Sequence, residues 1–253
     1  MAIKNLGWIA LGGFTVGFLA FGGAYAAGGK ELWRLENVPG WFGNNWMSDV
    51  VWHGRCRTDD KVEMAERRWS WNGSDEVNIT VPGDIHYKVG EGTEIIVRGP
   101  SDILDHIVIE DDSIRLNCRS YRSGRGLDVT LPGRAFREIN IAGSGDLVGE
   151  NIDQDQLSIN LAGSGSVRAV GNAESVEISI AGSADAKLGE LKMQRLELNI
   201  AGSGNAEAGP SEEAEVNVMG SGNLKLLSNP KKLETNIMGS GRVIHAGPKQ
   251  TGI

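Results

Sequence analysis

The sequence predicts an all-β fold, a parallel β-helix with coils of about 19–20 residues, preceded by a signal segment or transmembrane helix. Three observations predict it. A Gly-Ser motif recurs six times at nearly constant spacing, apolar and polar residues alternate ahead of each copy, and an uncharged apolar stretch opens the chain. A fixed repeat period of this length is typical of solenoids, in which each repeat is one structural unit.

Residues 1–29 are expected to export the chain. No charged residue lies between Asn5 and Gly29, and this stretch is long enough to cross a bilayer as a helix. Ala24 to Ala26 read "AYA", which resembles a signal-peptidase site, so cleavage is one alternative. The apolar run is longer than the usual signal-peptide core, which favours a retained membrane anchor.

Residues 30–71 form a second segment, which holds six of the seven tryptophans. Tryptophan is enriched at membrane interfaces and in binding hot spots. We therefore expect a juxtamembrane segment in which Trp33, Trp41 and Trp46 contact the membrane or a partner protein. The alternative is that these rings cap the open end of the following fold.

The two cysteines, Cys56 and Cys118, fit an oxidising compartment, where they could form a disulfide. Isolated buried thiols are the alternative. A metal site is not expected at either cysteine, because only His53 lies near one of them in the sequence.

Residues 72–247 are expected to form the β-helix domain, with residues 248–253 as a tail. From Glu76 to Leu131, apolar runs of four to six residues alternate with turn residues, which favours strands over helices. These runs are VNITVPG, IHYKVGEG, EIIVRGP, HIVIEDD, SIRLNC and LDVTLPG.

The six repeats fill residues 139–247. Their corner glycines are 20, 19, 20, 18 and 19 residues apart, and a serine follows each one. A glycine ends each strand because it adopts positive φ without steric cost. The corner pairs are Gly143-Ser144, Gly163-Ser164, Gly182-Ser183, Gly202-Ser203, Gly220-Ser221 and Gly239-Ser240.

Each repeat contains a strand with one buried face. The residues four and two before the corner glycine are apolar, with Thr235 as the exception, and this period of two indicates a strand. Between them lies an asparagine in five repeats and Ser179 in the third. One further step back lies a glutamate in five repeats and Ser158 in the second. The asparagines are Asn140, Asn160, Asn199, Asn217 and Asn236.

Stacking follows because one such unit cannot bury its apolar face alone. Coils in register would place neighbouring strands roughly 4.8 Å apart and line the asparagines up as a ladder along the stack. An antiparallel sandwich would not return the same residue to the same column six times. The calcium-binding nonapeptide solenoid does not fit, because the period differs and its repeated aspartate is missing.

The repeats of Ala/Met-Gly-Ser-Gly/Ala, after an exported N-terminus and a region of short strands, resemble a bacterial envelope family. That family is described as putative auto-transporter adhesin, head GIN domain, and the resemblance covers roughly residues 76–247. It implies a right-handed β-helix in the cell envelope and supplies no catalytic residues. Ala184 replaces the second glycine of one corner, and Met219 and Met238 precede the last two corner glycines, which indicates variation at single corners.

These observations favour a non-enzymatic binding or scaffold domain that contacts a protein or a glycan. We expect the helix to hold it at the periplasmic face of the inner membrane, with the outer surface as the alternative. The six corner serines are equivalent, whereas an active site needs one set of unlike groups, so we expect no catalytic residue, cofactor or metal ion. Nucleic acid is not an expected partner, because the net charge is −8.

Three other functions stay open. An uncleaved helix followed by a tryptophan-rich segment would suit an accessory subunit of a larger membrane complex. A polysaccharide-active enzyme could use paired carboxylates, and a divalent cation could bridge the same column. The carboxylates concerned are Glu177, Glu197, Glu215 and Glu234.

Overall fold

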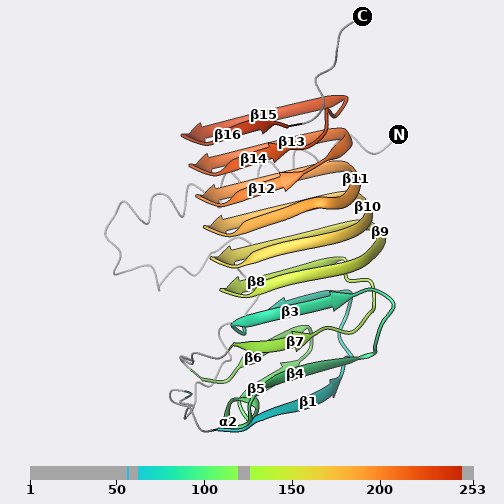
Figure 1. Ribbon diagram of the computed structural model, residues 1–253, viewed down its shortest axis with the longest axis vertical. Coiled ribbons are helices and arrows are strands. Elements are labelled where there is room, and N and C mark those ends of the chain that lie inside the picture. Colours follow the sequence, from blue (N-terminus) through green and yellow to red (C-terminus); the bar gives the residue numbers. More distant parts are fainter. Residues whose placement is uncertain (1–55, 57–61, 119–125, 247–253) are drawn as a thin grey trace, which may run out of the picture. The chain divides into compact units, whose positions relative to one another are not determined.

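The computed structural model describes Cys56, residues 62–118 and residues 126–246 (Figure 1). The chain divides into two units, Met1–Val51 and Trp52–Ile253, and every described residue belongs to the second. The expected signal or anchor at 1–29 and the tryptophans Trp33, Trp41 and Trp46 lie outside the described residues. Within the described ranges, no helix is long and apolar enough to cross a bilayer.

The predicted parallel β-helix is confirmed over the six repeats, whose strands stack coil upon coil (Figure 1). The register places each residue beside its counterpart in the next repeat, as Ile178 lies beside Ile159 and Leu198. The strands are β8 (Glu138–Gly143), β9 (Asp146–Gly163), β10 (Ser166–Gly182), β11 (Asp185–Gly202), β12 (Asn205–Ala208), β13 (Pro210–Gly220), β14 (Asn223–Leu226), β15 (Lys232–Gly239) and β16 (Arg242–His245).

Two bends close each coil. At the Gly-Ser corner the chain turns through a glycine, and all six corner glycines have φ between 118° and 141°. The opposite bend lies inside the long strands β9, β10 and β11, which curve around it without interruption (Figure 1). Asn151 and Gly171 supply positive φ there, at 55° and 137°.

The core lies between the two faces of each coil. The residues four and two before each corner glycine point inward, and their columns are buried through the fifth repeat. The first of these columns holds Ile139, Ile159, Ile178, Leu198 and Val216, each at most 1% exposed. Burial of such columns is the main force that holds successive coils together.

The upstream runs form strands, as predicted. They are β2 (Glu76–Ile79), β3 (Gly83–Lys88), β4 (Glu94–Pro100), β5 (Ile107–Glu110), β6 (Ser113–Leu116) and β7 (Leu127–Thr130). Strand β2 pairs in parallel with β8, and β3 pairs in parallel with β9. On their other edges, β2 pairs in parallel with β6 and β3 pairs in parallel with β7. The parallel stack therefore begins two coils before the first Gly-Ser corner.

The N-terminal end departs from the parallel pattern. Strand β1 (Met64–Ser70) pairs antiparallel with β4, β4 pairs antiparallel with β7, and β5 pairs antiparallel with β6. Only two residues connect β5 to β6, and a parallel crossover needs a much longer connection. A four-residue helix, α2 (Ser101–Leu104), which the short-strand pattern did not predict, buries Ile103 and Leu104 completely.

A disulfide joins Cys56 to Cys118, with 5.6 Å between their Cα atoms. It spans 62 residues of sequence. The bond therefore ties the residue that precedes the first strand to the end of the β5–β6 hairpin. The disulfide, α2 and the antiparallel strands all lie at this end of the solenoid.

Candidate functional site

The glutamate face is the outward side of the strands that precede each corner. We define it by one residue from each coil, and the pairing register places these residues side by side. They are Glu76, Glu138, Ser158, Glu177, Glu197, Glu215 and Glu234. Glu76 was not expected here, although "EVNI" at 76–79 matches "EINI" at 138–141 and could have indicated it.

The asparagine ladder runs beside the glutamate face and contains side-chain hydrogen bonds between coils. Asn140 Nδ2 donates to Asn78 Oδ1 at 3.0 Å, and Asn160 Nδ2 donates to Asn140 Oδ1 at 2.7 Å. A second run begins after Ser179, where Asn217 Nδ2 donates to Asn199 Oδ1 at 3.0 Å. Asn236 lies in register with Asn217 in the last coil. Ser179 divides the ladder because its hydroxyl is too short to replace an amide.

The same amides hold the glutamates in place. Asn140 donates to Glu138 Oε1 at 3.1 Å and to Glu76 Oε1 at 3.3 Å. Asn199 donates to Glu197 Oε1 at 3.2 Å and is only 3% exposed, the one buried polar residue in the part of the chain that the structure describes. Hydrogen bonds to a buried amide restrict both partners. The carboxylates of Glu76, Glu138 and Glu197 are therefore each held by an asparagine amide.

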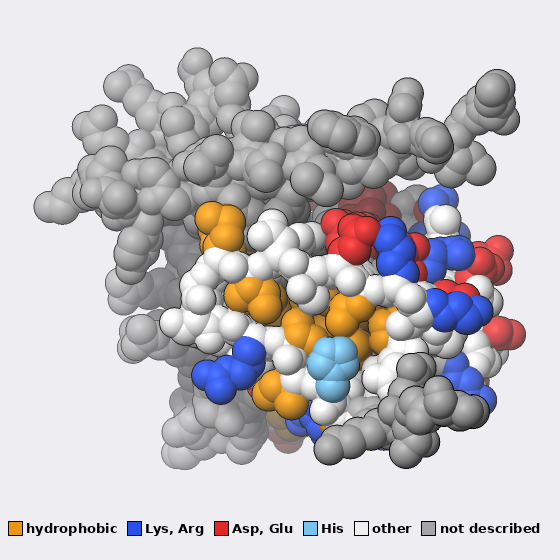
Figure 2. All heavy atoms as spheres, turned by 90° about the horizontal axis from the view of Figure 1, so that it is seen from above, with side chains coloured by type: hydrophobic (Ala, Val, Ile, Leu, Met, Phe, Trp, Pro, Cys, Tyr) orange, Lys and Arg blue, Asp and Glu red, His pale blue; other side chains and the backbone are white. Residues whose placement is uncertain are grey.

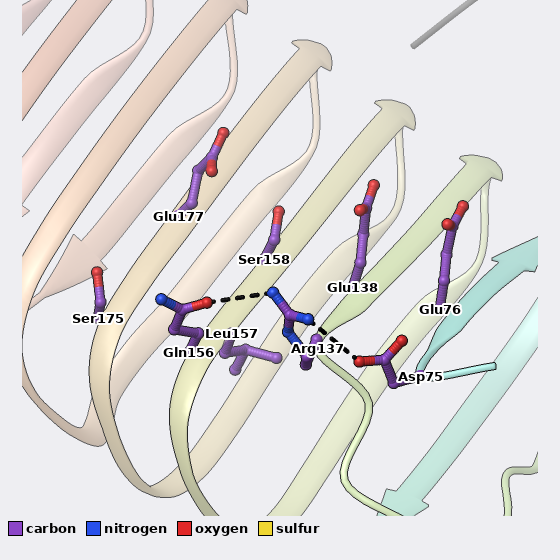
Figure 3. Close-up of a pocket in the computed structure, with 9 residues that line it drawn as sticks. All are labelled: Asp75, Glu76, Arg137, Glu138, Gln156, Leu157, Ser158, Ser175 and Glu177. Atoms are coloured by element: carbon purple, nitrogen blue, oxygen red, sulfur yellow. Dashed lines mark hydrogen bonds and ion pairs between the residues drawn. The ribbon is translucent and has the colours of Figure 1, made fainter. Parts of the chain in front are cut away.

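A shallow pocket of about 420 Å³ opens where Ser158 replaces glutamate in the column. Figure 3 shows two rows of side chains around it, one on the glutamate face and one beside the bend of the coils. The first row is Glu76, Glu138, Ser158 and Glu177, and the second is Asp75, Arg137, Gln156 and Ser175.

Arg137 is the cation of this pocket. Its Nη1 lies 3.5 Å from Asp75 Oδ2, and its Nη2 donates to Gln156 Oε1 at 3.4 Å (Figure 3). Both contacts direct the guanidinium along the second row. Its charge is therefore partly balanced by Asp75, and the four glutamate-face positions beside it hold three carboxylates.

The glutamate face carries negative charge that its neighbours do not neutralise. In the described ranges, Glu234 forms an ion pair with Lys232 at 2.9 Å, whereas the other five glutamates of the face form none. Partial burial raises the pKa of the Glu177 carboxyl above its ordinary value, and the carboxylates of Glu197 and Glu138 raise it further. A ligand that brings hydrogen-bond donors or positive charge would relieve this repulsion.

A second polar row follows the Gly-Ser corners, three residues after each corner glycine. Ser166 Oγ donates to Asp146 Oδ1 at 2.7 Å, and Asn205 Nδ2 donates to Asp185 Oδ1 at 3.0 Å. Asn223 Nδ2 then donates to Asn205 Oδ1 at 2.9 Å. This row was not predicted, although a polar residue stands at that position in every repeat and could have indicated it.

The family model described as "putative auto-transporter adhesin, head GIN domain" matches residues 74–247, which include both polar rows and the pocket. The chain belongs to this family. The resemblance inferred from the Gly-Ser repeats is therefore confirmed. No curated protein sequence matches the chain.

Several solved structures are similar to this head GIN domain, and one with a TM-score above 0.5 shares its fold. One is a putative adhesin from Bacteroides fragilis, at 19% identity and a TM-score of 0.53, with 72% of this chain and 97% of that chain covered. A putative lipid binding protein from Parabacteroides distasonis matches at 17% identity and a TM-score of 0.47, covering 73% and 97%. A putative adhesin from the same species matches at 18% identity and a TM-score of 0.48, covering 73% and 98%.

The corner serines of the head GIN domain occupy equivalent structural positions. The backbone N–H groups of Ser164, Ser183 and Ser203 each donate to the carbonyl of the corner glycine in the preceding coil, at 2.8–3.0 Å. Ser221 and Ser240 repeat this bond. Their common role is to link one corner to the next, and the geometry distinguishes none of them as a nucleophile.

The chemistry available on the glutamate face is that of hydrogen-bond acceptance. Carboxylates repeat from coil to coil, and Arg137 is the only basic residue among those that line the pocket. Among the described residues, no group of three or more histidine, cysteine, aspartate or glutamate side chains has the geometry to hold a metal ion. The face therefore suits a ligand that presents several hydroxyl or ammonium groups.

Proposed function

We propose that the protein is a non-enzymatic binding domain of the bacterial cell envelope, and that its glutamate face binds a glycan with neutral or amino sugars. One observation carries the proposal. Five glutamates of the face form no ion pair in the described part of the chain, and a pocket opens beside three of them. Sugar hydroxyls and amino groups donate hydrogen bonds, and carboxylates accept them.

The position in the cell belongs to the same proposal. The uncharged run from Asn5 to Gly29 would hold the domain at the membrane, on the exported side. The disulfide between Cys56 and Cys118 supports an oxidising compartment. Membership in a family described by adhesion supports a binding role.

Non-enzymatic binding fits the face better than glycan cleavage. Cleavage by two carboxylates requires one of them to act as an acid and the other as a base or nucleophile, in different environments. Glu138, Glu197 and Glu215 each accept a hydrogen bond from the asparagine two residues further along, so these three carboxylates have similar environments. Glu177 differs, because Ser179 stands at that position and the pKa of the Glu177 carboxyl is raised. Release of shorter sugars from a bound glycan would contradict this part of the proposal.

A glycan array probed with the full-length protein in detergent tests the proposal. The variant Ser158→Glu adds a carboxylate where the column is interrupted and fills the pocket, so we expect glycan binding to fall about tenfold or more. Ser203→Glu, at an exposed corner outside the pocket, is the matched control and should bind as the wild type does. Absence of glycan binding, or equal binding by Ser158→Glu, would contradict it.

A further inference from the structure

In the described part of the chain, the last coil has no coil stacked on its outer side. Strand β15 pairs only with β13, and β16 pairs only with β14, among the residues that the structure describes. Each of these strands therefore leaves one edge of backbone N–H and C=O groups without a strand partner. Such edges readily pair with another strand.

Large apolar side chains of β15 and β16 are exposed on the last coil. Ile237, Met238 and Ile244 are 36%, 60% and 49% exposed, and the one other exposed large apolar residue in the described ranges is Met64. Figure 2 looks onto this end and shows hydrophobic side chains gathered at its centre, with charged side chains beside them. Solenoids usually need a polar capping repeat at each end, and the last coil does not provide one.

The other end of the solenoid is built differently, although its outermost strand β1 also pairs along only one edge among the described residues. Helix α2 covers it with two fully buried residues, the antiparallel strands β1 and β4 run across it, and the disulfide fixes it. A head-to-tail contact between two copies would therefore join unlike surfaces. Two C-terminal ends, by contrast, have the same outline and the same pair of open strands.

We propose that the protein forms a two-fold symmetric dimer in which the last coils of two copies meet, with β15 antiparallel to β15 of the second copy. A two-fold axis perpendicular to the strands, passing midway between the Thr235 residues of the two copies, places each β15 beside its own copy. This arrangement continues the β-sheet across the interface and uses one self-complementary patch, as two-fold dimers do.

The residues of β15 support this register. With Thr235 opposite its own copy, Leu233 faces Ile237 on the interior side, where both extend apolar columns of the solenoid. On the outer side, Glu234 faces Asn236 and Lys232 faces Met238, so no like charges are opposed. A shift of the axis to Glu234 would place two glutamates opposite each other, which is destabilising.

Charge variants at Met238 test the dimer and its register in the full-length protein in detergent, by sedimentation velocity over a range of concentrations. Met238→Lys places a second cation opposite Lys232, so we expect the dimer to dissociate about tenfold more readily. Met238→Glu should retain the dimer, because it faces Lys232 with the opposite charge. Met64→Lys, at a methionine 54% exposed and outside the last coil, is the matched control and should leave association unchanged.

A cysteine at the two-fold axis gives a second test that does not depend on weakening the contact. Thr235→Cys should form a disulfide-linked dimer under mild oxidation, whereas Ser70→Cys, exposed at the end of β1, should not. Dimers that dissociate equally in Met238→Lys and Met238→Glu would overturn the register. A wild-type monomer at every concentration, or no cross-link through residue 235, would overturn the dimer and leave the open end to a different chain.

Discussion

The corner glycines have two separate structural requirements, and the sequence indicates only one of them. Positive φ is common to all six corners. The second requirement is that no Cβ atom be present, and it arises only when a corner stacks on the corner of the preceding coil. A Cβ on Gly202 would lie 2.2 Å from the carbonyl oxygen of Gly182 in the preceding coil, whereas a Cβ on Gly143 would meet nothing within 4 Å.

The pair Gly143→Ala and Gly202→Ala separates these two costs. We expect Gly143→Ala to lower the free energy of unfolding by about 1–2 kcal/mol, through backbone strain at a φ of 118°. Gly202→Ala should cost about 3 kcal/mol or more, because the carbonyl of Gly182 must also move. Urea unfolding of both variants measures the difference, and equal losses would show that contact between corners adds nothing.

Glu177 makes the stability of the fold depend on pH. Its pKa in the folded state is raised, by partial burial first and then by Glu197 and Glu138. The folded state therefore binds this proton more tightly than the unfolded state does. As pH rises from 4.5, the ordinary value of the group, through its folded pKa, this residue makes the fold less stable.

The variant Glu177→Gln should remove this loss of stability at higher pH. We expect its urea midpoint to exceed that of the wild type at pH 7, and the two midpoints to converge below pH 4.5, where the wild-type carboxyl is protonated. Glu174→Gln is the control, because its carboxylate is paired with Arg195 at 2.6 Å and its removal should bring no gain at pH 7. A Glu177→Gln midpoint below the wild type at pH 7 would contradict the sign.

At the scale of elements, most strands were predictable, whereas β1, α2 and the antiparallel pairing at the N-terminal end were not. Period-two alternation and a fixed repeat identify β8 to β16, because each strand there buries one face against the coil beside it. Strand β1 shows no such alternation, since five of its seven residues are exposed. Helix α2 has four residues, too few for a helical period to appear in the sequence.

The glutamate face and the asparagine ladder were also predictable, since both lie in columns that the repeat defines. The pocket was not. Its second row, which includes Arg137 and Gln156, lies beside the bend, away from the columns that precede each corner glycine. Ser158 and Ser179 were visible as interruptions, but only the neighbouring coils show that one opens a pocket and the other divides the ladder.

At the scale of the whole β unit, stability should vary along the stack. Each coil contacts mainly its two neighbours, so the energy of a solenoid is close to a sum of local and nearest-neighbour contributions. The central strands β10 and β11 are paired along both edges. Among the residues that the structure describes, β15 and β16 are paired along one edge only, and they have exposed side chains in positions that are buried elsewhere. The last coil should therefore open before the centre does.

Amide hydrogen exchange of the full-length protein measures this gradient. We expect protection to be highest in β10 and β11 and lowest in β15 and β16 in the monomer. Ile180→Ala, at a central site 2% exposed, should cost about 2–5 kcal/mol and speed exchange in β9, β10 and β11. Ile237→Ala, 36% exposed, should speed exchange only in the last coil.

Protein concentration then links this gradient to the open end. If two copies pair through β15, dilution should speed exchange in β15 while exchange in β10 stays constant, because only the last coil loses a partner. Met238→Lys should show fast exchange in β15 at every concentration. Uniform protection from β10 to β15 in a monomer would mean that the last coil is as stable as the centre, and that its open edge needs no second strand.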